Sequence, residues 1–202
     1  MNRVDAFTVI TIRGALEAEK RLVEKSMRHG VTLTVLLGDA VKTETFQLPV
    51  RESLVVAPLT SERRAQLVQG LSYVASGDEA LAVPLLINPL EGMFWSEAEE
   101  RGKIVRNEKG KWRRTDNAAP VGGLEAVLDA LAPDVSDDLS DFIRAVVYGG
   151  PGDRFRHGTA TSGWELRAAL LCFAVAGWLE FSTDFDAEQI IRSAFRDRRD
   201  ET

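Results

Sequence analysis

The chain has 202 residues, of which 45% are hydrophobic and 28% are charged, and its 25 basic and 31 acidic residues give a net charge of −6. This balance is typical of a folded globular protein and excludes an intrinsically disordered chain. One cysteine and two histidines exclude a disulfide scaffold and zinc fingers, which need several such side chains.

The N-terminal segment and the longest apolar run indicate a compartment. Residues 1–10 lack the basic start and long apolar stretch of a signal peptide. The longest apolar run, 168–179, is shorter than the roughly 20 residues of a membrane span, so it predicts a buried helix. We therefore expect a soluble cytoplasmic protein that has no contact with membranes.

The first part of the chain is rich in β-branched residues. Residues 6–12 predict a strand, and 15–29 predict a helix supported by an i,i+4 pair of Glu24 and Arg28. Three further strands are predicted at 31–37, 43–48 and 53–57, so this part is expected to be β-α-β-β-β.

The middle of the chain mixes helix and strand signals. Thr60 or Ser61 predicts the start of a helix that runs to about residue 75 and ends at Gly77. Residues 81–87 predict a buried or edge strand interrupted by Pro84, and 96–99 have the spacing of a helix start. Residues 103–115 predict a β-hairpin with its turn at 107–110.

A polar segment at 116–123 divides this mixed portion from a helical one. Beyond it, helices are predicted at 124–131, 136–148, 163–181 and 185–199, with caps at Ser162 and at Thr183 or Asp184. The expected fold class is α+β: a 1–116 α/β or α+β portion with a basic hairpin and a 121–202 portion of four helices. The two portions are either separate units or parts of one core.

The predicted hairpin concentrates positive charge. Apart from Glu108 all its charged residues are basic, and it includes one aromatic residue; the candidate binding residues are Lys103, Arg106, Lys109, Lys111, Trp112, Arg113 and Arg114. A basic hairpin with an aromatic ring suits a nucleic-acid backbone or an acidic protein partner. Alternatively, the charges keep an exposed edge strand from aggregating.

An aromatic cluster precedes the hairpin. Phe94 and Trp95 lie in a predicted loop at 90–95, where such a cluster anchors an interface or folds back onto the core.

The most unusual segment is the glycine-rich loop 149–158, which contains Arg154, Arg156 and His157 between two predicted helices. Arginines suit phosphate or carboxylate groups and histidine titrates near neutral pH, whereas an ordered loop with exposed arginines is the structural alternative. Residues 136–181 contain, in order, a predicted helix, this loop with His157-Gly158, and a long apolar helix. In this order of elements they resemble HEPN-type helical domains of abortive-infection and toxin–antitoxin proteins. The resemblance implies a metal-independent RNase that uses His157 with Arg154 or Arg156, in a site formed across a homodimer.

No nucleotide-binding, serine-hydrolase or zinc-protease motif is present in the sequence. The acidic cluster of Asp134, Asp137, Asp138 and Asp141 suits a helix start more than a metal, and Cys172 is expected to be a buried small side chain. No cofactor or metal is therefore expected.

The leading hypothesis is a non-enzymatic protein that binds another protein, as an accessory or immunity component of a bacterial defence or toxin system. The alternatives are the HEPN-like RNase and a nucleic-acid-binding accessory subunit that uses hairpin 103–114.

Overall fold

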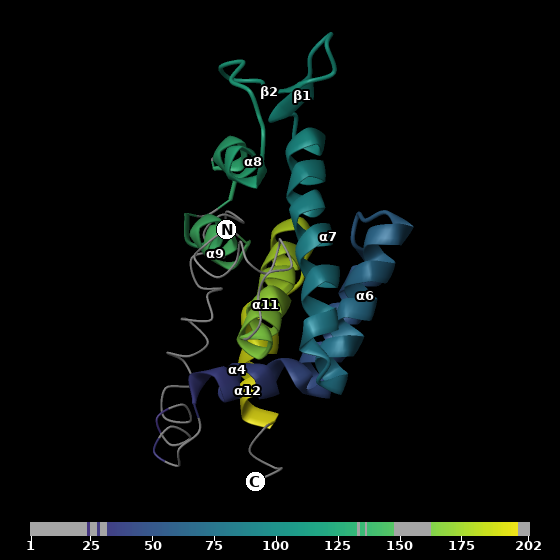
Figure 1. The fold of residues 1–202 in the computed structure, drawn as a ribbon, viewed down its shortest axis with the longest axis vertical. Helices are drawn as coiled ribbons and strands as arrows, with labels where there is room; N and C mark the ends of the chain where they lie inside the picture. The colour runs from purple at the N-terminus through teal and green to yellow at the C-terminus, as the bar shows by residue number, and fades with distance from the viewer. Residues whose placement is uncertain are drawn as a thin grey trace.

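The computed structural model describes residues 24, 28, 32–132, 134–135, 137–147 and 163–197. This part of the chain is 74% helix and 5% strand, with eight helices and one two-stranded sheet (Figure 1). The predicted β-α-β-β-β portion is therefore wrong wherever the structure describes it. The predicted strand at 6–12 and most of the helix at 15–29 lie outside the described residues, although Glu24 and Arg28 are helical and form the expected ion pair at 3.6 Å.

Two helices replace three predicted strands. Helix α4 (Leu33–Lys42) begins after Thr32, whose hydroxyl accepts a hydrogen bond from the Val35 amide, and α5 (Glu44–Val56) is capped in the same way by Thr43. The apolar residues Phe46, Val50 and Leu54 recur every four positions and are fully buried, which is the spacing of one helix face. The alternation of polar and apolar residues at 43–48 predicts a strand, but the segment is too short to distinguish the period of a strand from the period of a helix.

Helices α6 and α7 form a long antiparallel pair (Figure 1). Helix α6 (Ser61–Ser76) confirms the prediction, with Thr60 as its cap and Gly77 in the left-handed conformation (φ 81°) at its end. Helix α7 (Glu79–Glu100) corrects two predictions, because it contains both the supposed strand 81–87 and the supposed loop 90–95. A proline inside a helix costs about 3 kcal/mol, and α7 holds Pro84 and Pro89. The burial of its apolar face offsets that cost.

The C-terminal helices follow the predicted pattern closely. They are α8 (Leu124–Leu131), α9 (Asp137–Val147), α11 (Trp164–Ser182) and α12 (Ala187–Asp197). Helix α11 is buried on all sides and lies in the middle of the molecule, with α7 and α4 packed against it (Figure 1). The apolar run 168–179 is thus a buried helix, as expected, and no helix in the described ranges is long and apolar enough to cross a bilayer.

The cap of the last helix was mispredicted. The Asp186 carboxylate, not Thr183 or Asp184, accepts the hydrogen bond from the Gln189 amide at 2.9 Å. At the start of α11, Gly163 is the capping position, and Ser162 lies outside the described residues.

One cluster of buried apolar side chains contains residues from before and after segment 116–123. Strands β1 (Ile104–Arg106) and β2 (Trp112–Arg114) extend beyond the C-terminal end of α7, at the end of the molecule opposite α4 and α12 (Figure 1). The helical body therefore presents the hairpin at one extremity.

Candidate functional site

The basic hairpin has the geometry that the sequence predicts. Strands β1 and β2 are antiparallel, with Val105 opposite Arg113 and Arg106 opposite Trp112. The turn is closed by a 2.9 Å hydrogen bond from the Asn107 amide to the Lys111 carbonyl. The Asn107 side-chain oxygen also accepts from the amides of Lys109 and Lys111, both at 3.0 Å. One asparagine thus organises the loop that carries two of the lysines.

The chain after β2 covers the far edge of that strand. The Arg114 amide donates to the Ala119 carbonyl at 2.9 Å, and the Val121 amide donates to the Trp112 carbonyl at 3.1 Å. Strand β2 is therefore bordered on one side by β1 and on the other by residues 119–121, which form an isolated bridge to it at Pro120.

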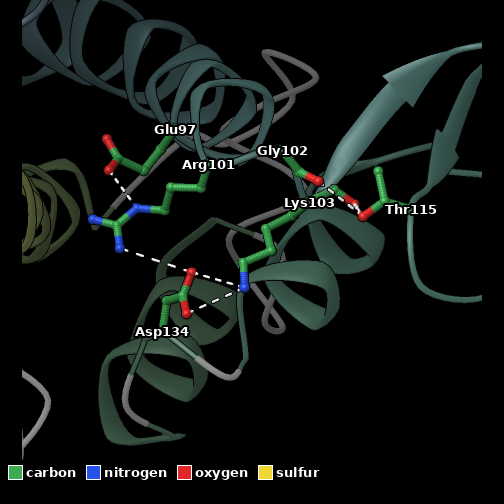
Figure 2. Close-up of polar contacts among 6 residues, drawn as sticks. All are labelled: Glu97, Arg101, Gly102, Lys103, Thr115 and Asp134. Carbon is green, nitrogen blue, oxygen red and sulfur yellow. Dashed lines mark hydrogen bonds and ion pairs between the residues drawn. The ribbon is translucent and has the colours of Figure 1, made fainter.

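The base of the hairpin is held by a polar cluster (Figure 2). The Lys103 ammonium and the Arg101 guanidinium both point toward Asp134, at 3.1 and 3.8 Å. Arg101 also donates to the Glu97 carboxylate at 2.7 Å, and its guanidinium lies 4.1 Å from the centre of the Phe181 ring. The charge of Lys103 is therefore compensated, and this residue ties the hairpin to the segment between α8 and α9.

Arg114 is compensated as well. Its guanidinium forms a two-pronged ion pair with Asp116, at 3.0 and 2.6 Å. This hydrogen bonding raises the pKa of Arg114 and lowers the pKa of Asp116, so both groups stay charged over the physiological range. Of the six predicted cations, Lys103 and Arg114 thus stabilise the hairpin rather than present free charge.

Two aromatic residues meet beside the last strand pair before the turn, with their rings tilted at 51° to each other. The rings of Trp95 on α7 and Trp112 on β2 lie 5.7 Å apart, and the Arg106 guanidinium lies 4.6 Å from the Trp112 ring centre. Phe94 is fully buried in the core, so it has no exposed surface for a partner. Of the two predicted residues Phe94 and Trp95, only Trp95 contacts the hairpin, through the ring of Trp112.

The remaining cations meet at the tip. Arg106, Lys109, Lys111 and Arg113, with Asn107 and Glu108, line an open hollow of about 590 Å³. Arg113 also donates to the Ala118 carbonyl at 3.3 Å. No carboxylate of the described part of the chain forms an ion pair with these four side chains, so the tip carries 4 − 1 = +3 charges. The hollow is therefore an open, positively charged surface rather than an enclosed cavity.

The other predicted site residues do not join this surface. Arg154, Arg156 and His157 lie outside the described residues, so their role stays a prediction. Cys172 is completely buried, and burial raises the pKa of its thiol, which leaves it unreactive. Within the described ranges, no three Cys, His, Asp or Glu side chains gather in a way that would hold a metal ion.

Two acidic residues that shape the site, Asp134 and Glu97, are not among the residues that the sequence predicts for it. Asp134 lies 31 positions from Lys103, and only the packing of α8 against α7 brings the two together. The spacing at 96–99 predicts that a new helix starts there, whereas Glu97 lies inside the long helix α7. Local spacing could have indicated two of the ion pairs, since Glu97 lies four residues before Arg101 and Asp116 lies two residues after Arg114.

Comparison with known proteins adds no relative: no family model matches the sequence, and neither curated proteins nor solved structures give a match.

Proposed function

We propose that this protein acts by binding an acidic protein partner through the tip of its basic hairpin. The observation that carries the proposal is the group of four cations, Arg106, Lys109, Lys111 and Arg113, which one acid balances only in part. They lie at one extremity of a body that is otherwise strongly acidic, since the rest of the chain carries −6 − 3 = −9 charges. Such a separation of charge steers an oppositely charged partner to one end of the molecule.

The contacts of the Trp112 ring favour a protein over a nucleic acid. Binding of single strands without sequence preference relies on aromatic faces on which bases stack. Here the Trp112 ring is contacted by both Trp95 and Arg106, so it supports the arginine instead of presenting a face. The acidic remainder of the chain would also repel a long polyanion. The hairpin suits a short acidic segment better than an extended phosphate backbone.

The expected strength of the charge contacts alone is small. An exposed ion pair contributes about 0.2–1 kcal/mol, so four pairs contribute roughly 1–4 kcal/mol. That total corresponds to a dissociation constant of about 1 mM at best. Binding should weaken as salt is added, since the Debye length falls from about 10 Å at 0.1 M to 3 Å at 1 M.

A comparison of two polyanions of similar charge tests the proposal. Fluorescence anisotropy would measure binding of labelled octaglutamate and of a labelled eight-nucleotide thymidine single strand, at 20 mM and 200 mM NaCl. The tip variant is Lys109→Gln/Lys111→Gln, and the matched control is Arg28→Gln/Arg196→Gln, which removes the same charge from exposed helix positions.

We expect octaglutamate to bind at low salt, the tip variant to weaken binding at least fivefold, and the control to stay within twofold. Equal weakening by both variants, or tighter binding of the oligonucleotide than of octaglutamate, would contradict the proposal.

A further inference from the structure

A groove on the helical body is lined by apolar and acidic side chains. It lies between α5 and the turn that joins α11 to α12, and its volume is about 620 Å³. Every residue that lines it is at least partly exposed. Val56 is 79% exposed, more than any other large apolar side chain in the described part of the chain. The groove therefore leaves apolar surface in contact with water, and its apolar lining comes from Pro49, Val56, Pro58, Phe185 and Ile190.

The charge of this groove is opposite to the charge of the hairpin tip. Glu52, Asp184 and Asp186 line the groove, and none of the described residues that line it is basic, so the lining carries −3 charges. The hollow at the tip carries +3 charges and has a similar volume of about 590 Å³. The groove therefore repels an acidic segment and attracts a basic surface such as the tip.

The tip also carries an apolar side chain that matches the groove. Val105 is 50% exposed and lies directly opposite Arg113 in the register of the two strands. Side chains that are directly opposite in an antiparallel pair lie on the same face, so this valine and this arginine are neighbours. That face can place Val105 against Val56 and Phe185 of a groove while the cations of the tip meet its acids.

The tip and the groove of one molecule do not meet. The hairpin extends away from the helical body, whereas the groove lies on α5, on α12 and on the turn before α12 (Figure 1). A tip therefore reaches a groove only in another molecule. Each copy supplies one tip and one groove, so the two surfaces are present at equal concentration in any solution of the protein.

We propose that the acidic partner of the hairpin tip is a second copy of this chain, which offers the groove between α5 and α12. This inference rests on the proposed function and names the partner. Because the contact joins two different surfaces, either two copies make it reciprocally or further copies extend it. The contact of Val105 with the groove adds apolar burial to the charge contacts. The two surfaces are small, so the association is weak and decreases as salt is added.

Reversal of the charge on each surface tests this contact. The tip variant is Lys109→Glu/Lys111→Glu, which changes the charge of the tip from +3 to 3 − 4 = −1. The groove variant is Glu52→Lys/Asp184→Lys, which changes the charge of the groove from −3 to −3 + 4 = +1. All four positions are exposed, and circular dichroism checks that each variant is folded. Neither variant retains opposite charges on its own two surfaces, whereas the tip of each is opposite in charge to the groove of the other.

Sedimentation velocity at 20 mM and 500 mM NaCl, with protein up to about 1 mM, measures the self-association. We expect the wild-type protein to associate at 20 mM NaCl and at least tenfold more weakly at 500 mM. Each variant alone should associate at least tenfold more weakly than the wild type at 20 mM, whereas an equimolar mixture of the two should come within threefold of it. The matched control is Glu125→Lys/Asp141→Lys, which adds the same charge as the groove variant at exposed positions on α8 and α9, and it should stay within twofold.

Self-association of either variant at the strength of the wild type, or a mixture that stays monomeric, would overturn the contact between tip and groove. If the wild-type protein is monomeric at both salt concentrations while octaglutamate binds it, this inference is wrong and the proposed function stands. If the wild-type protein is monomeric and octaglutamate does not bind, both proposals are wrong.

Discussion

Asp134 is the residue whose removal should most clearly loosen the base of the hairpin. Its carboxylate lies 3.1 Å from the Lys103 ammonium and 3.8 Å from the Arg101 guanidinium, and the three side chains are only 26–34% exposed. Asp134→Asn keeps the shape and removes the charge that both cations share. Exposed pairs contribute about 0.2–1 kcal/mol, and partial burial with two partners places this one near the upper end. We therefore expect the free energy of unfolding to fall by about 1 kcal/mol.

Urea denaturation followed by circular dichroism measures this change. With a slope of roughly 2 kcal/mol per molar urea, the midpoint should fall by about 0.5 M. The matched control is Asp141→Asn: Asp141 is 78% exposed, and its partner Arg144 keeps a second ion pair with Asp129. The control should change stability by less than about 0.5 kcal/mol. Equal effects of the two variants would refute the idea that Asp134 clamps the hairpin.

Three other perturbations have defined outcomes. Burial, assisted by the neighbouring Asp186 and Glu188 and opposed by a hydrogen bond from the Ala187 amide, raises the pKa of Glu180 from its ordinary 4.5 to about 7. Between these values the unfolded chain has lost a proton that the folded chain still holds, so stability should fall as pH rises from about 4.5 to about 7. Thermal melts of Glu180→Gln should lose that slope, and an unchanged slope would show that another group is responsible. Phe94→Ala should cost about 3–5 kcal/mol in urea denaturation because the ring is fully buried, and a loss under 1 kcal/mol would contradict its place in the core. Thr60→Ala should cost about 1 kcal/mol in the same assay because it removes the bond to the Arg63 amide, whereas Thr60→Ser should be nearly neutral.

The hairpin was predictable because its causes are local. Asn107 and Gly110 lie within four residues of each other and supply the turn, and Gly110 adopts the left-handed conformation at φ 71°. Its charges were also evident from the sequence. What the sequence did not show is which charges are free: Lys103 and Arg114 have acidic partners, and Arg106 lies on a tryptophan.

The mistaken strands have a common physical reason. Segments 31–37, 43–48 and 81–87 are β-branched or contain proline, and their intrinsic preference is weakly against helix. Burial decides otherwise, since Leu86, Leu90 and Phe94 reach the core only when α7 is continuous through Pro84 and Pro89. A prediction from short windows cannot weigh that distant packing against a local penalty.

Local chemistry along the chain therefore defined the C-terminal helices, the capping threonine at position 60 and the basic hairpin. Each of these depends on residues that are close in sequence and on one clear periodicity. Tertiary structure decided the helical form of 33–56 and 79–100, because α4 and α7 pack on α11, α5 packs on α12, and α7 also packs on α6. It also decided which cations of the hairpin are available, because Asp134 reaches Lys103 only after α8 has packed on α7. The sequence determines which charges the hairpin carries, whereas the fold determines which of them have an opposite charge beside them, because those partners come from distant segments of the chain.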